Sequence, residues 1–347
     1  MAYFFKLPPI TNLTIGQQSA LNDPNPIAIS GGPGTGKSVV SLWRHIRNYG
    51  IGSKRSLLLT YTVTLERYLS ASASSENQNA GKKDAVNRTY SWTFGGNRSN
   101  YDEIIIDEAQ DVESDRYDII KRHSNAISYG ADDQQIVFSN TATTQQELAQ
   151  IFPRNNNYVL DENFRNSYEI MLFIKALFPN KLISQNTMAD LLAKGRRGNK
   201  PIVLISNNNQ DKQTKAILDI INQFKSDTHN IAILVPLANH VTTYFNIIQN
   251  AGIRCSKYTN ENGELSIIEN VHITTFKSSK GTEFDTVIIP DFQNMKNNIA
   301  QLNVINENDY YVALTRARRN LYLICSTQVE FLQNSPQQLT TFSTENL

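Results

Sequence analysis

The chain has 347 residues, which is enough for two domains of ordinary size. Hydrophobic residues make up 40% and charged residues 19%, which fits folded globular domains and excludes a disordered or fibrous protein. The 33 Lys and Arg residues nearly balance the 32 Asp and Glu residues, so the net charge of +1 excludes a global basic field that attracts nucleic acid. Any nucleic-acid binding must therefore depend on local positive charge.

Only two cysteines occur, Cys255 and Cys325, and both stand in apolar surroundings. They are too few for a disulfide framework and lack the neighbouring ligands of a zinc site, so we expect buried thiols in a reducing cytoplasm. The first residues have too short an apolar run for a signal peptide, and no run reaches the roughly 18 apolar residues of a membrane span. We expect a soluble cytoplasmic protein without a membrane partner.

Short apolar runs alternate with helical patterns along the chain. A strand is predicted at 26–30, followed by a helix at 39–50 that ends at a glycine. Further strands are predicted at 55–62, 101–111, 125–134, 200–206, 230–236, 270–276, 285–290 and 320–326, with a helix at 211–225. This alternation predicts an α/β fold with parallel sheets that helices cover on both faces.

The predicted elements fall into two groups, which we expect to form one domain over 1–155 and a second over 156–347. The polar run at 153–158 is the expected hinge between them. Two further polar stretches, 70–87 and 293–309, are expected to be mobile surface loops.

The stretch SGGPGTGKSVV (30–40) follows the first predicted strand and opens the first predicted helix. Residues 31–38 fit the pattern G-x-x-x-x-G-K-[ST] in the strand-to-helix context that this motif requires. Lys37 is then expected to reach the β and γ phosphates of a nucleotide, and Ser38 to bind Mg²⁺. The backbone N–H groups that face the phosphates are those of Gly34, Thr35 and Gly36.

Two polar clusters follow later strands. IIIDEAQD (104–111) presents Asp107 and Glu108 at the end of a strand, where one acid can hold the Mg²⁺ shell while its neighbour orients and deprotonates water. Because only hydrolysis needs a base for water, these adjacent acids favour an ATPase over the alternative of a small-molecule kinase. In YGADDQQ (129–135), Gln134 is the candidate sensor of the γ-phosphate.

Arginines beyond the P-loop could stabilise the charge of the transition state. Arg165 lies just past the expected hinge in ENFRN, and Arg316 lies in the second half in YYVALTRARRN. If both reach across a cleft, hydrolysis is coupled to domain closure, as in a motor. On spacing alone, an alternative stays open in which Arg316, Arg318 and Arg319 form a solvated helix end.

In their order, these motifs resemble the core of superfamily 1 helicases of the UvrD/Rep type over about residues 13–324. The resemblance implies two RecA-like P-loop NTPase domains with ATP in the cleft between them. The matching stretches are LTIGQQSAL, GGPGTGKS, LLLTYTVTLERYL, RTYSW, IIIDEAQD, GADDQQIVF, LDENFRNS, TTFKSSKGTEFDTVII and YYVALTRARRNLYLI.

The resemblance also implies roles for single residues. It implies that Asp107 binds Mg²⁺ and that Glu108 is the base. It also implies that Gln17 reads the adenine of ATP and that Phe164 stacks on the base. Arg165 would meet the γ-phosphate, and Arg316 would be an arginine finger in cis. The other positions that it places at the nucleotide are Arg44, Gly281 and Glu283. The positions that it places on single-stranded nucleic acid are Thr60, Tyr61, Thr89, Tyr90, Trp92, Phe138 and Lys277.

The sequence departs from the family pattern at three places. Ala131 stands where the family usually has Asp, and no Trp follows it, which leaves Phe138 as the substitute. Lys277 stands where the family often has His. Longer relatives carry accessory domains, called 1B and 2B, between these motifs. The interval from GGPGTGKS to IIIDEAQD and that from LDENFRNS to TTFKSSKGTEFDTVII are too short to hold them.

The first hypothesis is therefore an ATP- and Mg²⁺-dependent helicase or translocase on single-stranded nucleic acid, acting 3′→5′ on DNA, with RNA as the alternative. Because the DNA-handling parts are reduced, a second hypothesis stays open. The chain could be the ATPase switch subunit of a prokaryotic anti-phage defence complex, with a nuclease or other effector as its protein partner.

Overall fold

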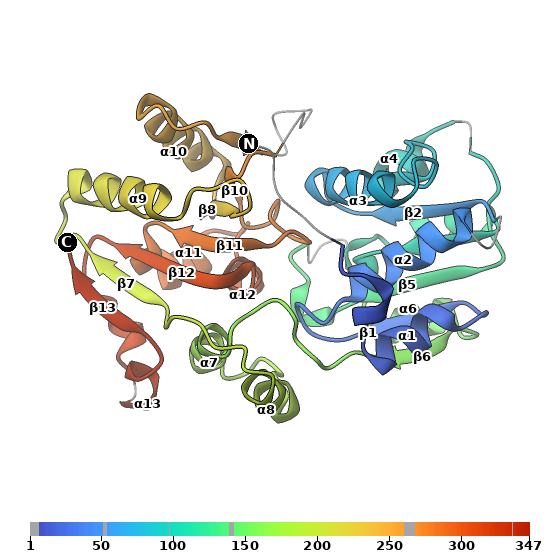
Figure 1. The fold of residues 1–347 in the computed structure, drawn as a ribbon, viewed down its shortest axis with the longest axis horizontal. Coiled ribbons are helices and arrows are strands. Elements are labelled where there is room, and N and C mark those ends of the chain that lie inside the picture. The colour runs from blue at the N-terminus through green and yellow to red at the C-terminus, as the bar shows by residue number, and fades with distance from the viewer. Residues whose placement is uncertain (1–6, 51–53, 97, 139–141, 260–267, 335) are drawn as a thin grey trace. The chain divides into compact units, whose positions relative to one another are not determined.

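The computed structural model describes residues 7–50, 54–96, 98–138, 142–259, 268–334 and 336–347. The described chain forms two compact units, one extending to Phe164 and the other running from Arg165 to Leu347 (Figure 1). The expected boundary after residue 155 is corrected, because the strand β6 (Asn156–Val159) pairs along β1 (Ile27–Ser30) and so belongs to the first unit.

The first unit contains, within the described residues, a 6-stranded sheet of order β3-β2-β4-β5-β1-β6. Every pairing in it is parallel. This order brings the carboxyl ends of β4, β5 and β1 side by side, at the edge where ligands bind in sheets of this kind. The remaining strands are β2 (Ser56–Thr60), β3 (Val86–Arg88), β4 (Glu103–Ile106) and β5 (Ile127–Ala131).

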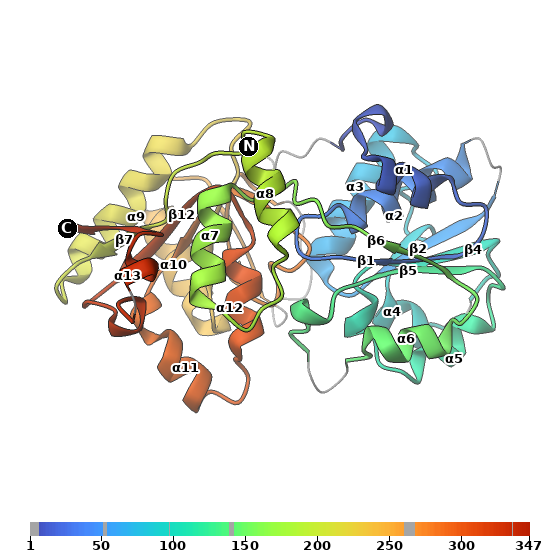
Figure 2. The same ribbon diagram turned by 90° about the horizontal axis from the view of Figure 1, so that it is seen from below.

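Helices cover both faces of this sheet (Figure 2). On one face, α1 (Ile15–Asn22), α2 (Lys37–Tyr49) and α3 (Val63–Glu76) bury residues such as Val40 and Leu69 against Ile105 of the sheet. The other face is covered by α4 (Thr89–Phe94), α5 (Arg116–Lys121) and α6 (Gln145–Ile151). Because both faces are buried, the inner strands read as near-continuous apolar runs.

The second unit has its own sheet of order β13-β7-β12-β11-β8-β10-β9, which is 7-stranded over the residues that the structure describes. All of its pairings are parallel. Its strands are β7 (Ile202–Ile205), β8 (Ile231–Val235), β9 (Ser256–Tyr258), β10 (Val271–Thr275), β11 (Phe284–Ile289), β12 (Ala317–Cys325) and β13 (Ser343–Asn346).

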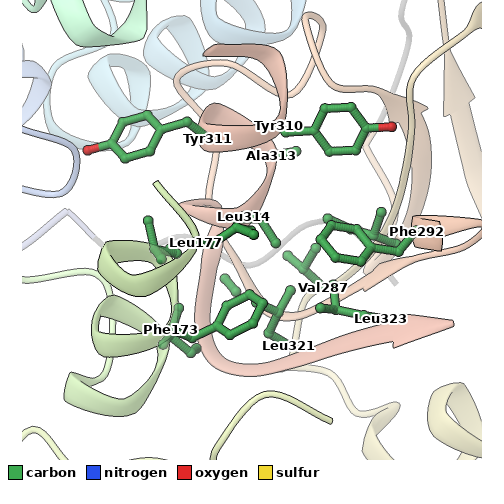
Figure 3. Packing of buried hydrophobic residues seen from close by; sticks show 14 of the residues in the cluster. Phe173, Leu177, Val287, Phe292, Tyr310, Tyr311, Ala313, Leu314, Leu321 and Leu323 are labelled. Carbon is green, nitrogen blue, oxygen red and sulfur yellow. The ribbon is translucent and has the colours of Figure 1, made fainter. Parts of the chain in front are cut away.

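Two apolar clusters hold helices to this second sheet. One contains α9 (Gln210–Phe224) and α10 (Ala238–Asn250), which pack on one face. The other contains α7 (Tyr168–Leu177), α8 (Gln185–Ala193), α11 (Met295–Gln301) and α12 (Glu307–Leu314). In that cluster Phe173 and Leu314 lie close to Leu321 of β12 (Figure 3). A short helix, α13 (Pro336–Leu339), precedes β13.

Both units therefore confirm the predicted α/β class with parallel sheets, and each predicted strand has its counterpart. Three local expectations are wrong. The expected hinge at 153–158 contains the start of β6. The stretch 293–309 contains α11 and the start of α12, and the stretch 70–87 contains the end of α3 and the start of β3.

The turn between α3 and β3 is tied down by buried groups. Ser70 Oγ donates to the carbonyl of Gly81 at 2.7 Å. The ring of His45 has its Nε2 2.8 Å from the carbonyl of Ala80, and burial lowers the pKa of this histidine to about 4. A neutral imidazole thus holds the turn.

Among the helices of the described residues, none combines the length and the apolar character that crossing a lipid bilayer requires.

Candidate nucleotide site and nucleic-acid surface

The P-loop, residues 31–38, joins the end of β1 to the start of α2. Three of its glycines have positive φ angles, 144° at Gly31, 75° at Gly34 and 87° at Gly36. A Cβ atom at Gly31 would lie 2.1 Å from the carbonyl oxygen of Leu160, which is backbone and cannot move aside. The loop therefore needs glycine at Gly31 for space as well as for conformation.

Lys37 begins α2, and its side chain is almost enclosed. Its Nζ donates to the carbonyl of Gly31 at 2.6 Å and to that of Gly32 at 3.0 Å. The same atom lies 3.8 Å from Oδ2 of Asp132. Thr35 Oγ1 donates to the carbonyl of Gly32 at 2.9 Å. Hydrogen bonds from Thr35 and Lys37 therefore stabilise the loop from within.

Gly130 in β5 marks the point where the motifs converge. A Cβ atom built there would be in ordinary van der Waals contact with three groups, at 3.6, 3.6 and 3.7 Å: Asp107 Oδ1, Lys37 Cβ and Ser41 Oγ. The backbone N–H of Asp107 donates to the carbonyl of Leu59 at 2.8 Å, which continues the pairing of β4 with β2. The end of β4, the middle of β5 and the start of α2 therefore meet around one small space.

Ser38 and Asp107 are the predicted Mg²⁺ ligands. Ser38 is half-buried in the first turn of α2, and Asp107 is buried directly after β4. Across the described residues, no three His, Cys, Asp or Glu side chains gather as a metal site. One hydroxyl and one carboxylate fit Mg²⁺, because this ion is commonly bound by one or two protein oxygens together with substrate phosphates and water.

Glu108, the predicted base, has a left-handed backbone with φ 58° and ψ 44°. Its Oε2 accepts a hydrogen bond from Gln110 Nε2 at 2.6 Å. The other end of the same amide accepts from the backbone N–H of Asp132 at 3.1 Å. Gln110 is fully buried and so ties the base to the end of β5. Gln110 could not be identified as a site residue from the sequence, where only its place two residues after Glu108 pointed to the site.

Asp132 is a second residue that the sequence analysis missed. Its carboxylate accepts from the backbone N–H of Gln134 at 3.0 Å and from Gln135 Nε2 at 2.6 Å, besides lying near Lys37. Gln134, the predicted γ-phosphate sensor, is half-buried in the turn that Asp132 caps. Ala131 ends β5 inside an apolar cluster. The pattern that could have identified Asp132 is the pair of adjacent acids that directly follows β5.

Gln17 and Phe164 both contact the P-loop. Gln17 Nε2 donates to the carbonyl of Thr35 at 2.9 Å, and its Oε1 accepts from the backbone N–H of Thr14 at 2.9 Å, which caps α1. The backbone N–H of Phe164 donates to the carbonyl of Gly34 at 2.8 Å. The structure therefore brings both predicted nucleotide residues to the loop.

Arg44 is a structural residue, and its predicted nucleotide contact is corrected. Its Nε donates to Glu103 Oε1 at 2.6 Å, and Glu103 begins β4 at the opposite edge of the sheet from the P-loop. The remaining guanidinium nitrogens donate to the carbonyls of Ala20, Asp23 and Asn25. These contacts join the end of α1 to α2 and β4.

The second unit places Arg165 beside the motif that precedes β11. Arg165 Nε donates to Glu283 Oε2 at 3.1 Å. The other oxygen of Glu283 lies 3.7 Å from Arg318 Nη1, which is also 3.8 Å from Asp285. Gly281 precedes them with φ 81°. Glu283, predicted to contact the nucleotide, is thus part of an ion-pair chain that holds Arg165.

Arg316 is buried, with 1% of its surface exposed, which excludes the solvated helix end for this residue. Its guanidinium donates to the carbonyl of Val312 at 2.9 Å, to the carbonyl of Thr282 at 3.2 Å and to Thr315 Oγ1 at 3.1 Å. The side chain of Arg319 is 71% exposed and fits that alternative better. Hydrogen bonds within the second unit therefore hold the Arg316 side chain in place.

Two aromatic groups of the first unit lie at the predicted nucleic-acid surface. The rings of Tyr61 and Phe138 are 4.7 Å apart, which brings the stretches LLLTYTVTLERYL and GADDQQIVF together. Tyr90 is 57% exposed, and its ring lies 4.5 Å from that of Phe94, which is 61% exposed. The Arg116 guanidinium lies 4.1 Å over the Phe94 ring. The sequence analysis did not identify Phe94 or Arg116.

Three of the predicted nucleic-acid residues are buried and are corrected to packing roles. Thr60 and Thr89 are fully covered, and Thr89 Oγ1 donates to the carbonyl of Thr60 at 3.2 Å. Trp92 is also buried, with its ring edge-on to that of His123 at 5.3 Å. None of these side chains presents a face to a base, because Thr60 is buried at the end of β2 and Thr89 and Trp92 are buried in α4.

Lys277 pairs with an acid at the start of α12. Its Nζ lies 3.8 Å from Asp309 Oδ1. Burial raises the pKa of Asp309 to about 6, and Lys277 opposes that increase. The lysine side chain is 25% exposed, so a phosphate contact from Lys277 would compete with this pair.

Comparisons with known proteins agree with this geometry. Residues 25–211, more than half of the chain, match the family model of the Schlafen group 3 DNA/RNA helicase domain. Residues 239–328 match the UvrD-like helicase C-terminal domain. The chain therefore belongs to the family of the Schlafen group 3 DNA/RNA helicase domain and has the core of a UvrD/Rep-type superfamily 1 helicase.

Two individual relatives match parts of the chain. A protein of Acanthamoeba polyphaga mimivirus, named as an ATP-dependent DNA helicase, is 28% identical over 243 residues, which cover 63% of this chain and 34% of that protein. The RecBCD enzyme subunit RecB of Chlamydia pneumoniae is 44% identical over 68 residues, 20% of this chain and 6% of that protein. The chain thus spans only about a third of the mimivirus protein.

Among solved structures, S. cerevisiae Dbp5 bound to RNA and ADP BeF3 is similar, with a TM-score of 0.58 and 10% identity. The match covers 96% of this chain and 89% of that chain. At this identity the likeness shows the fold alone. It agrees with two RecA-like α/β domains.

Proposed function

We propose that this chain is an ATP-dependent motor that translocates on single-stranded DNA. The observation that carries the proposal is the convergence of Lys37, Asp107 and Asp132 at the carboxyl edge of the first sheet. A P-loop lysine beside a carboxylate suited to Mg²⁺ is the arrangement that ATP hydrolysis needs. The helicase families that the chain matches support nucleic acid as the track, and the mimivirus relative supports DNA.

Each group has a role in the proposed reaction. The P-loop backbone and Lys37 bind the phosphates of ATP, while Ser38 and Asp107 hold Mg²⁺, which neutralises phosphate charge when bound. Glu108, oriented by Gln110, positions the attacking water and accepts its proton.

The arginines of the second unit complete the proposal. Arg165 and Arg316 stabilise the negative charge that the γ-phosphoryl group carries in the transition state. The proposal therefore requires that both reach the nucleotide bound by the first unit. Binding and release of ATP would then move one unit relative to the other.

The track is proposed to lie along the aromatic residues of the first unit. Tyr90 is exposed and Tyr61 and Phe138 are half-buried, and bases of any sequence can stack on aromatic rings of this kind. By the family resemblance, we propose movement in the 3′→5′ direction. Processive unwinding is not part of the proposal, because the intervals that hold accessory domains in longer relatives are short here.

The test is steady-state ATPase activity with single-stranded DNA, double-stranded DNA and RNA in parallel. We expect single-stranded DNA to raise kcat strongly. A Glu108→Gln variant should bind ATP normally but hydrolyse it roughly 10²- to 10⁴-fold more slowly. A matched control is Glu113→Gln, which changes a surface acid that pairs with Arg116.

Two results would overturn the proposal. Hydrolysis that no nucleic acid changes would contradict the motor. Full activity of Glu108→Gln would remove the assigned base.

A second candidate is favoured by the burial of Thr60, Thr89 and Trp92, which leaves a reduced nucleic-acid surface. In this candidate the chain is an ATPase switch that acts through a protein partner, such as the nuclease of a defence complex. It predicts ATP-dependent activation of a co-purifying effector. Unaided translocation by the purified chain would exclude it.

A further inference from the structure

The residue after Arg165 binds the backbone on both sides of Arg316. Asn166 is 1% exposed, and its Nδ2 donates to the carbonyl of Thr315 at 3.0 Å and to that of Ala317 at 2.6 Å. Thr315 and Ala317 directly precede and follow Arg316. One buried side-chain amide thus binds the carbonyl of the peptide that precedes Arg316 and the carbonyl of the residue that follows it.

Three further hydrogen bonds interlock the same region. The N–H of Ser167 donates to the carbonyl of Arg318 at 3.1 Å, and the N–H of Phe284 donates to the carbonyl of Arg316 at 2.9 Å. The Arg316 guanidinium in turn donates to the carbonyl of Thr282. The segments around residues 166, 283 and 316 therefore form one hydrogen-bonded assembly within the second unit.

Arg316 follows a helix that core packing holds in place. The helix α12 is held by core packing, with Tyr310 and Leu314 buried and Leu314 beside Leu177 of α7 (Figure 3). Arg316 itself lies past the end of α12, in the turn that leads into β12. Its direction therefore depends on the groups that bind this turn, which include the Asn166 amide and the backbone N–H of Phe284.

We propose that Asn166 is a positioning residue that aims Arg316 and links it to Arg165. The inference rests on the proposed function, because it assumes that both arginines act on ATP. Asparagine suits this role, since a single planar NH₂ group carries two donors for two carbonyls. The backbone of residue 166 continues directly from that of Arg165, so both arginines are mounted on the same assembly.

The first measurement is the kinetics of Asn166→Ala. A displaced Arg316 weakens stabilisation of the transition state and leaves ground-state binding intact. We expect kcat to fall roughly 10- to 100-fold, as for misplacements of about 1 Å, with KM for ATP nearly unchanged. Affinity for ADP with aluminium fluoride, a transition-state mimic, should fall, whereas affinity for ADP alone should not.

The matched control is Asn270→Ala. Asn270 is also a buried amide of the second unit, and its Nδ2 donates to the carbonyl of Asp227 and to Asn230 Oδ1, both at 3.3 Å. Neither of these two bonds is to Arg165, Asn166 or Arg316. We expect it to lower thermal stability to a similar degree without changing kcat or the preference for the transition-state mimic. Similar kinetics for both variants would overturn the inference.

The second measurement is a double-mutant cycle with Arg316→Ala. If Asn166 acts through Arg316, Asn166→Ala should have no further effect on kcat once Arg316 is removed. Independent, multiplicative losses would overturn the positioning role. If Asn166→Ala does not fold, Asn166→Ser keeps one donor and should give an intermediate kcat in the same cycle.

The two proposals fail in different ways. If Arg316→Ala hydrolyses ATP at the rate of the unchanged chain, the arginine finger of the proposed function fails. If Arg316→Ala is impaired but Asn166→Ala behaves like Asn270→Ala, only the inference about Asn166 fails.

Discussion

At the residue scale, the nucleotide site depends on side chains that join distant parts of the chain, such as Gln110, which connects Glu108 to the backbone of Asp132. The P-loop pattern required no tertiary information, because a glycine-rich turn between a strand and a helix is local. Gln110, Asp132 and Asn166 were missed, because each acts through bonds to residues that are distant in sequence. Arg44 was assigned wrongly for the same reason, since its partner Glu103 lies at the far end of another strand.

The close approach at Gly31 gives a prediction for a single residue. Gly31→Ala places a Cβ atom against the Leu160 carbonyl and strains a backbone with φ 144°. We expect a loss of at least about 1–3 kcal/mol in the free energy of unfolding, together with loss of ATP binding. Thermal denaturation and binding of a fluorescent ATP analogue measure the two effects.

Gly32→Ala is the matched control for that change. No atom lies within 4 Å of a Cβ atom built at Gly32, which belongs to the same loop. The control should keep the stability of the unchanged chain. Equal behaviour of the two variants would show that the backbone contact at Gly31 has no effect.

At the scale of elements, apolar runs predicted the long strands well because parallel strands covered on both faces are apolar throughout. The strands β3, β6, β9 and β13 were missed, since they are short and largely polar. The helix α3 was partly taken for a loop because it is rich in Ser and Ala. Its buried positions Leu65, Leu69 and Ala73 still recur every four residues, which is the pattern of a helix face.

The start of α12 gives a prediction for an element. Asp309 caps this helix by accepting from the backbone N–H of Asn306 at 2.8 Å, and its pKa is about 6 in the folded chain, against 3.8 for the ordinary group. Between about pH 4 and pH 6, the Asp309 carboxyl is therefore largely protonated in the folded state and largely ionised in the unfolded state. Stability falls as pH rises through this window.

Asp309→Asn should abolish that dependence. Relative to the unchanged chain, the variant should gain up to about 3 kcal/mol between pH 4 and pH 6. Urea unfolding across this range measures the difference. Glu147→Gln is the comparison, because Glu147 caps α6 with a lowered pKa and its removal should change stability with the opposite sign. A constant difference between Asp309→Asn and the unchanged chain would contradict the assignment.

At the scale of the whole molecule, the two α/β units were predictable because strands and helices alternate along the entire chain. The position of the boundary was not, since β6 is polar and its membership depends on pairing with β1. Each unit holds part of the proposed catalytic set, Lys37 and Glu108 in one and Arg165 and Arg316 in the other. Hydrolysis by this set therefore requires both units.

This division predicts a change of distance between the units during the ATPase cycle. Donor and acceptor dyes can be attached at Gln150→Cys in α6 and Gln223→Cys in α9, both exposed positions. Burial raises the pKa of Cys255 to about 11 and that of Cys325 to about 12, so the native thiols should react slowly.

In a Glu108→Gln background, energy transfer between the dyes should differ between ATP and ADP. Arg316→Ala should reduce that difference, because the finger no longer engages the γ-phosphate. Identical transfer with ATP, ADP and no nucleotide would show that the units do not respond to the nucleotide.

The pairing of β6 with β1 also has a consequence for how the chain is made. The strand that leads into the P-loop lies between β5 and β6, yet its partner β6 is the last strand of the first sheet to be synthesised. Until residue 159 has left the ribosome, one side of β1 is an open edge with free N–H and C=O groups, which can pair with other chains. A fragment cut at the expected hinge would keep that open edge permanently, whereas a fragment that extends through Phe164 would close it.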